Sequence, residues 1–134
     1  MIGALDQSLQ FNASALRLRA DRQQLLAANI ANADTPGFKA VDFDFGRALD
    51  SATRASGSAG TARLTASAAG HFGSAPASTS AVLAFRPPSQ ASIDGNTVEM
   101  YAERAQFADN AVRYEAALKF LNGQIKTILS AIQG

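Results

Sequence analysis

Residues 100 to 132 read MYAERAQFADNAVRYEAALKFLNGQIKTILSAI, and this stretch decides the fold class. Its apolar residues recur with spacings that alternate between four and three, without a slip, over about four and a half heptads. Such spacing predicts a long helix with a coiled-coil seam. Arg104 is the one charged residue on the seam, and it either pairs with an acid on a neighbouring molecule or snorkels from the bundle edge. The predicted seam consists of Met100, Arg104, Phe107, Ala111, Tyr114, Leu118, Leu121, Ile125, Ile128 and Ile132.

The residues just before this helix predict how it begins. Asp94 and Gly95 suit a turn, and Asn96 is a favourable helix N-cap. Glu99 follows three residues later, as in a capping box. The helix is therefore expected from residue 97 to residue 133.

A second long helix is predicted at the other end of the chain, over residues 3 to 33. Helix-forming residues dominate there, and the segment ends at Pro36 and Gly37, which suit a type II turn with a positive φ at the glycine. The seam of this helix is apolar at most positions and polar at a few, which favours one register at a cost in stability. Its apolar members are Leu5, Leu9, Leu16, Leu26, Ile30 and Ala33, and its polar members are Asn12, Arg19 and Gln23.

The middle of the chain has a different composition. Residues 41 to 45 (VDFDF) alternate apolar and polar, which predicts a half-buried strand with Asp42 and Asp44 on its polar face, and residues 81 to 85 are a second candidate strand. Between them, 25 of the 31 residues from 51 to 81 are Ala, Ser, Gly or Thr, so this stretch is expected to be mobile in the isolated chain. Its local charge is positive, because Arg54, Arg63 and Arg86 occur there without an acid between Asp50 and Asp94.

These elements predict a mainly α fold, in which two long terminal helices pair as a coiled-coil-like hairpin around a loop-rich middle with candidate short strands. We expect three parts, at residues 1–36, 37–96 and 97–134. A two-helix hairpin with such an insert leaves much apolar surface in water. The chain should therefore pack against copies or relatives, as a filament or tube subunit does.

Composition argues against several other classes of function. The 12 Lys and Arg nearly balance the 11 Asp and Glu, so nucleic-acid binding is not expected. Without cysteine, and with His71 as the single histidine, no metal site is expected. No catalytic group, cofactor or small-molecule substrate is predicted, since no triad or phosphate-binding loop can be argued. We also expect no transmembrane segment and no cleaved signal peptide.

Two stretches resemble a known family. Residues 28 to 39 read ANIANADTPGFK, which is similar to the N-terminal signature of the bacterial flagellar basal-body rod and hook proteins. Residues 93 to 100 read IDGNTVEM, and with residues 41 to 45 they resemble the proximal-rod type within that family. The resemblance covers roughly residues 2–50 and 85–133.

The resemblance implies a structural subunit of the proximal rod, which transmits torque and encloses the export channel. Expected partners are other rod subunits, the junction protein between rod and membrane ring, and the flagellar type III export apparatus during transit. The alternatives are another axial subunit, of the second short rod type or hook type, and a helical adaptor or export chaperone. The signature corner is assigned to Asn29, Asn32, Thr35, Pro36, Gly37 and Phe38, and a second motif to Asp94, Gly95, Asn96, Val98 and Met100. The helix-packing interface is assigned to Leu5, Leu9, Leu16, Leu26, Ile30, Phe107, Tyr114, Leu118, Leu121, Ile125, Ile128 and Ile132.

Overall fold

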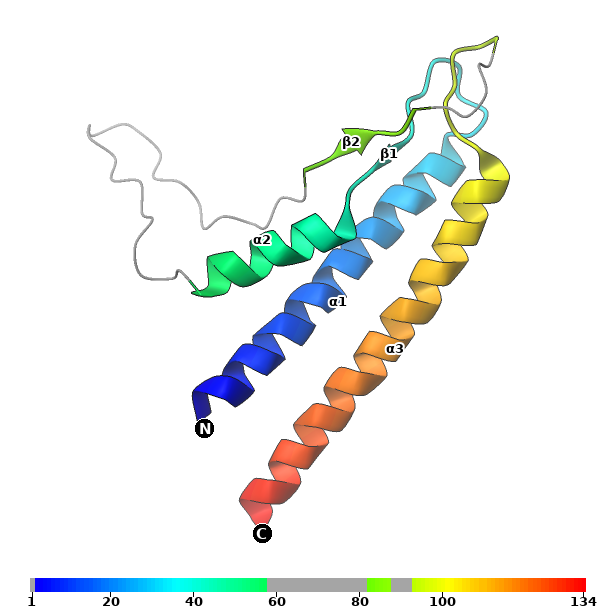
Figure 1. Cartoon of the computed structure of the whole chain (residues 1–134). Coiled ribbons are helices and arrows are strands. Elements are labelled where there is room, and N and C mark those ends of the chain that lie inside the picture. The colour runs from blue at the N-terminus through cyan, green and yellow to red at the C-terminus, as the bar shows by residue number, and fades with distance from the viewer. Residues whose placement is uncertain (1, 58–81, 88–92) are drawn as a thin grey trace, which may run out of the picture.

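The computed structural model describes residues 2–57, 82–87 and 93–134, and within them the chain forms three helices and two short strands. Helices α1 and α3 lie side by side, with both chain ends at one end of the pair and the two strands toward the other end (Figure 1). The predicted mainly helical fold with paired terminal helices is confirmed. The elements, in order, are α1 (Ile2–Ala31), β1 (Val41–Asp42), α2 (Phe45–Gly57), β2 (Ala84–Phe85) and α3 (Met100–Gln133).

Helix α3 begins later than predicted. It starts at Met100, with Glu99 in the N-cap position, so the assignment of Asn96 as the cap was wrong. The Asn96 side chain instead donates hydrogen bonds to carbonyls at the end of α1. Its Oδ1 accepts the Val98 backbone N–H at 2.7 Å, so the amide holds the turn ahead of the helix, and α3 begins three residues later than predicted.

The two strands pair antiparallel, with Val41 opposite Phe85 and Asp42 opposite Ala84. The strand predicted over residues 41 to 45 is thus shortened to its first two residues. Asp44 ends it, because the Asp44 Oδ1 accepts a hydrogen bond from the Arg47 backbone N–H at 3.1 Å and so starts a helix.

Helix α2 was missed by the sequence analysis, which placed a loop there. It packs on α1, and together with Leu18 and Phe43 it forms the main apolar cluster of the chain. The missed signal was the spacing of its inward residues, which is helical and not alternating. Those residues are Phe45, Ala48, Leu49 and Ala52.

The prediction that residues 51 to 81 are mobile was wrong for residues 51 to 57, because these residues belong to α2. The alanines that made this stretch look unstructured are good helix formers, and two small side chains of α2 fit closely against α1. The remainder of the prediction, including Arg63 and His71, lies outside the described residues.

Candidate functional site

The end of α1 is followed by a turn with the predicted geometry. The Phe38 backbone N–H donates to the Thr35 carbonyl at 3.2 Å, and Gly37 has a φ of +72°. With Pro36 before it, this is a type II turn, which requires a residue that tolerates positive φ in its third position. The Asn32 side chain donates to the Ala28 carbonyl at 2.8 Å, so it satisfies a carbonyl in the last turn as expected.

The second motif docks directly on this corner. Asn96 Nδ2 lies 2.7 to 3.1 Å from the carbonyl oxygens of Asn32, Ala33 and Thr35, and the side chain is buried. The Gly37 backbone N–H donates to the Asp94 carbonyl at 2.9 Å. These bonds hold the turn that follows α1, where the carbonyls of Asn32 and Thr35 also accept backbone hydrogen bonds. Two stretches about 60 residues apart in sequence therefore form one corner.

Further bonds extend the corner toward the strands. The Thr97 hydroxyl accepts from the Ala40 N–H at 2.7 Å, and the Thr97 N–H donates to the carbonyl of the half-buried Phe38 at 3.0 Å. Lys39 stays at the surface, where its ammonium reaches the Gly95 carbonyl at 2.7 Å. The half-buried Val98 donates its backbone N–H to Asn96 Oδ1 at 2.7 Å.

Asn29, assigned to the signature corner, connects α1 to the returning chain. Its amide bonds both backbone groups of Val41, at 2.9 Å to the carbonyl and 3.1 Å from the N–H. This pairing imitates a neighbouring strand and closes that edge of β1. Asn29 is buried, and it also donates to Glu103 at 3.2 Å. The helix thereby fixes the position of the returning chain.

A network of ion pairs lies beside Asn29, where α1, β1, β2 and α3 meet. Arg22 binds Asp42 through both its Nε and an Nη atom, at 3.0 and 2.9 Å. Arg86 bridges Asp42 and Glu103, and both arginines donate to the side-chain amide oxygen (Oε1) of Gln106, Arg22 at 3.3 Å and Arg86 at 2.8 Å. Two cations and two carboxylates make the network neutral.

This arrangement corrects two expectations from the sequence. Asp42 was expected on the polar face of a strand, in solvent or at an interface, yet its side chain is only 15% exposed and belongs to the network inside the chain. Arg86 was counted in a locally cationic loop, yet its charge is balanced inside the chain. Asp44, in contrast, is exposed as expected.

The network alters the ionisation of its members. Burial by itself would raise the pKa of Asp42, but hydrogen bonds from Arg22 and the Phe43 N–H, together with the arginine charges, hold that pKa below its usual value. The hydrogen bond to Asp42 likewise raises the pKa of Arg22. The pair of Arg22 and Asp42 is therefore charged at neutral pH.

The contact between α1 and α3 is polar along much of its length. Glu103 and Asn110 are fully buried there, and neither belongs to the predicted seam of α3. Asn110 donates to the Arg19 carbonyl at 2.9 Å and to Gln23 at 2.6 Å. Polar seam positions of α1 are thus satisfied by polar residues of α3, as one further pair shows. Gln124 accepts from Asn12 at 2.8 Å and donates to Ser8 at 2.6 Å.

The face of α3 turned toward α1 is therefore rotated from the predicted seam. Glu103, Asn110 and Gln124 line the contact at intervals of seven or fourteen residues, whereas several predicted seam residues beside them remain exposed. Of the predicted interface, Leu26 is buried, and the half-buried members are Leu9, Leu16, Ile30, Phe107, Tyr114, Leu121 and Ile128. The exposed members are Leu5, Leu118, Ile125 and Ile132.

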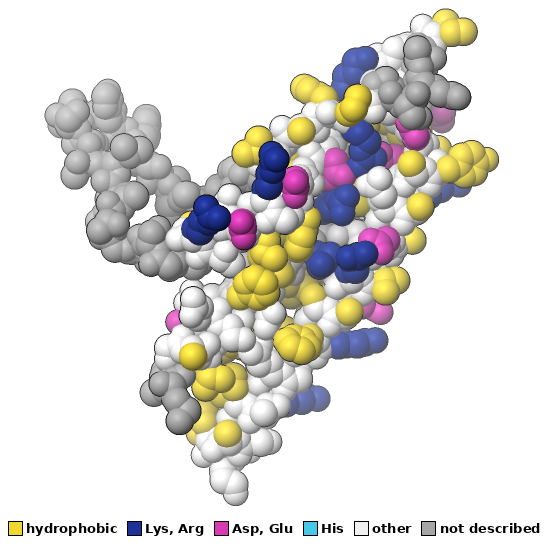
Figure 2. Space-filling view, viewed as in Figure 1, with side chains coloured by type: hydrophobic (Ala, Val, Ile, Leu, Met, Phe, Trp, Pro, Cys, Tyr) yellow, Lys and Arg dark blue, Asp and Glu magenta, His cyan; other side chains and the backbone are white. Residues whose placement is uncertain are grey.

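Exposed apolar residues form what we call the apolar stripe, defined as Leu118, Ile125, Leu129 and Ile132 of α3. Their spacings of seven, four and three place them on one helix face. Leu129 is 51% exposed and Ile132 is 77% exposed, which is unusual for large apolar residues that line up. Figure 2 shows apolar side chains at the surface along the molecule, including toward the end that carries the termini.

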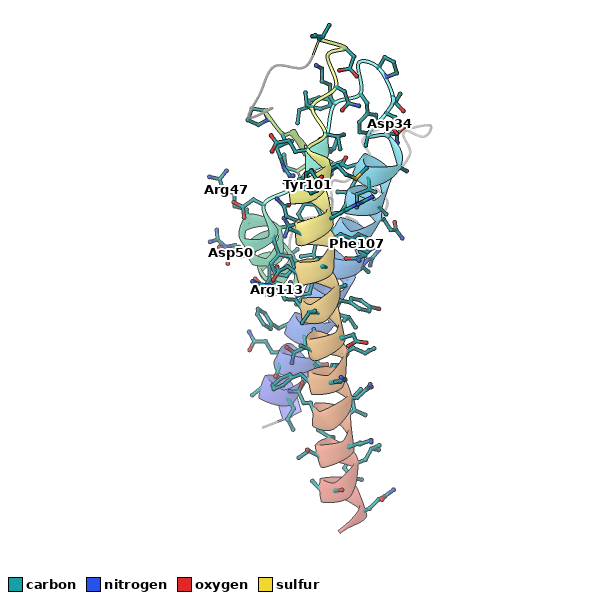
Figure 3. All side chains as sticks on the ribbon, turned by 90° about the vertical axis from the view of Figure 1, so that its right-hand side faces the viewer. Asp34, Arg47, Asp50, Tyr101, Phe107 and Arg113 are labelled. Carbon is teal, nitrogen blue, oxygen red and sulfur yellow. The ribbon has the colours of Figure 1, made fainter. Side chains whose placement is uncertain are left out.

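A groove continues the apolar stripe toward the middle of the hairpin. It has a volume of about 450 Å³ and lies between Ala20, Gln23 and Gln24 of α1 and Ala111, Tyr114 and Glu115 of α3. Ala111 is seven residues before Leu118, so the groove and the stripe share one side of α3. Figure 3 places Phe107 on one side of α3 and Arg113 on the side of α2, with Arg47 and Asp50 pointing outward.

The structure shows few features of a catalytic or ligand-binding site. Among the described residues no group of three or more His, Cys, Asp and Glu side chains could hold a metal ion. Within the same part of the chain, no helix is long and apolar enough to cross a membrane. The functional features are an internally satisfied corner and an unsatisfied apolar stripe.

Sequence reasoning missed Arg22, Arg86, Glu103 and Gln106, because charged residues on separate elements give no local pattern. One weak signal was present in the sequence. The polar residues Glu103 and Asn110 are seven residues apart, so they lie on the same face of a helix.

Comparisons with known proteins agree with this picture. The sequence profile of a family described as flagella basal body rod protein matches residues 9–39. The chain is 46% identical over 136 residues to the flagellar basal body rod protein FlgB of Salmonella typhimurium strain LT2, covering 100% of this chain and 99% of the relative. It is 45% identical over 135 residues to FlgB of Escherichia coli K12, covering 99% and 98%. It is 46% identical over 134 residues to FlgB of Cereibacter sphaeroides, covering 100% and 99%.

Proposed function

The chain belongs to the flagellar basal body rod protein family, and from this premise we propose that it assembles through the apolar stripe and the adjoining groove. It is a structural subunit of the basal body rod, of the proximal type, which serves flagellar motility and is not an enzyme. Full-length relatives that are rod proteins favour this function over a hook-type subunit or an export chaperone.

The exposed apolar stripe is the observation that carries the proposed mode of assembly. A helix face with Ile125 and Ile132 in water is unfavourable, because each buried side chain of this size gains about 1.5 to 3 kcal/mol. Within one subunit α1 cannot cover this face, since its own seam is occupied by the polar contacts with α3. A helix of a neighbouring rod subunit fits the groove and covers the stripe.

Finer parts of the proposal rest on the family resemblance. We place residues 1–36 and 97–134 in the inner layer of the rod and residues 37–96 in an insert. The rod would stand in the periplasm, contact the junction protein of the membrane ring, and receive this subunit through the type III export apparatus without a cleaved signal peptide. The support for these parts is the motif at residues 28–39 together with the motif at residues 93–100.

The assembly surface is tested by Ile125→Asp, with Lys126→Asp as the matched control. Both variants place an aspartate on α3, but only the first lies on the apolar stripe. A charge buried without a partner costs several kcal/mol, so Ile125→Asp should abolish rods in electron micrographs and swimming in soft agar. The purified variant should keep its helix content, because Ile125 is exposed in the single subunit. Normal swimming of Ile125→Asp would refute this assembly surface.

A further inference from the structure

Strand β2 has little contact of its own to hold it in place. It is two residues long, and both Ala84 and Phe85 are exposed. Its neighbour β1 is equally short, and two strands of this size are not stable by themselves in water. One backbone bond flanks the pair, from the Arg86 N–H to the Ala40 carbonyl at 2.9 Å. A stronger attachment must keep residues 82–87 on the hairpin.

The Arg86 guanidinium supplies that attachment. One Nη atom pairs with Glu103 in the first turn of α3, and the other binds Asp42 of β1 and the side-chain Oε1 of Gln106. Ionic hydrogen bonds with a planar fork geometry are stronger and more directional than neutral ones. A single side chain therefore ties the returning segment both to the strand beside it and to the helix behind it.

Arg22 cannot take over this role. In this network Arg22 forms its ion pair with Asp42, so Asp42 would still have one arginine partner if Arg86 were lost. Glu103, in contrast, is fully buried, and within the described residues Arg86 is its only cationic partner. Its carboxylate also accepts a hydrogen bond from the neutral amide of Asn29. Loss of Arg86 thus disconnects β2 from α3 and leaves a buried carboxylate without a counter-charge.

We propose that Arg86 is the positioning residue that fixes where the middle segment returns to the α1–α3 hairpin, and that rod assembly needs this position. The assembly part rests on the proposed function. Residues 82–87 bring the chain back to the hairpin at a point beside β1, so a fixed return point sets where β2 stands relative to α1 and α3. Neighbouring subunits then meet the long helices and the strand pair in one defined arrangement.

The position of β2 can be measured in the purified full chain by disulfide formation between Val41→Cys and Phe85→Cys. The chain has no other cysteine, and these residues face each other across the strands. Because the Arg86 N–H bonds the Ala40 carbonyl, residues 41 and 85 form a non-hydrogen-bonded pair, whose close Cα atoms suit a disulfide. Adding Arg86→Met should slow the reaction about tenfold or more, as expected for the loss of ionic hydrogen bonds. Adding Arg54→Met, at an exposed ion pair, should leave the rate unchanged.

Two further variants separate positioning from simple charge balance. Arg86→Lys keeps the charge without the fork and should lie between wild type and Arg86→Met. Combining Arg86→Met with Glu103→Gln removes the unpaired carboxylate, yet the disulfide should still form slowly, because nothing ties β2 to α3. Recovery of the wild-type rate in this double variant would show that Arg86 only neutralises Glu103, and would overturn the proposal.

The cysteine-free variants then connect position to assembly. Arg86→Met should lose rods and swimming while an immunoblot shows that the protein is made, and Arg54→Met should swim normally. An unchanged disulfide rate, or normal swimming of Arg86→Met, overturns the inference. The proposed assembly surface is tested separately, because it fails only if cells with Ile125→Asp also swim normally.

Discussion

The two ends of the α1–α3 hairpin differ in how far one subunit satisfies them. At the end with the corner, Leu26, Asn29 and Glu103 are buried, and polar groups from distant parts of the sequence are bonded to each other. At the end with the termini, Leu5 and Ile132 are exposed, and the contact between the helices is a polar one through Gln124. We refer to these as the closed end and the open end.

The difference explains how one chain can be both ordered and ready to assemble. The closed end contains the two sequence motifs, and its bonds stay within the subunit. The open end leaves its apolar residues exposed, because the inner contact there is polar. If the proposed assembly surface is correct, polar contacts fold the subunit and apolar contacts join it to its neighbours.

The largest difference between the two ends is expected when one large apolar side chain at each end is replaced by alanine. Leu26→Ala should lower the free energy of unfolding of the purified chain by about 2 to 5 kcal/mol, because Leu26 is completely buried and a cavity remains. Ile132→Ala should change it by less than about 0.5 kcal/mol, yet reduce rod assembly. Urea unfolding followed by far-UV circular dichroism measures the first quantity, and electron microscopy of basal bodies the second. Equal destabilisation by the two changes would remove the distinction between the ends.

A smaller effect is expected within the corner itself, from Gly37→Val. A Cβ at Gly37 would meet no atom within 4 Å, so the cost comes only from the positive φ of +72°. Strain of that kind costs about 1 to 3 kcal/mol, more for a β-branched residue. The variant should unfold more easily and swim poorly, whereas Lys39→Ala, which loses one exposed hydrogen bond, should swim nearly normally. The opposite result would indicate a charged docking site in place of a rigid corner.

The smallest effect is the loss of stability at low pH that comes from the ion-pair network. The pKa of Asp42 is lowered in the folded chain, so its contribution to stability is complete above the unfolded value of about 3.9 and is lost as the pH falls through the folded pKa. The free energy of urea unfolding, followed by far-UV circular dichroism, should thus show no Asp42-dependent change between neutral pH and about pH 5. Asp42→Asn should remove the acid-dependent part below that range. An Asp42-dependent loss already near neutral pH would contradict the observed pairing.

Several features followed from local sequence alone. Helix periodicity predicted both terminal helices, since the 3.6-residue repeat places apolar residues on one side whatever they pack against. Pro36 and Gly37 predicted the turn, because their φ preferences are properties of single residues. The motifs at residues 28–39 and 93–100 identified the family, which the relatives confirm.

Other features were decided only by the tertiary structure. Helix α2 depends on packing against Leu18, and a composition rich in small residues gave no sign of that partner. The face that α3 turns to α1 was misjudged, because apolar spacing cannot distinguish a contact within a subunit from one between subunits. Asn96 donates its amide to carbonyls of the turn after α1, and this tertiary contact gives no sign in the local sequence. Arg86 and Glu103 found each other across separate elements, and the free energy of such a pair depends on burial and geometry that no local pattern encodes.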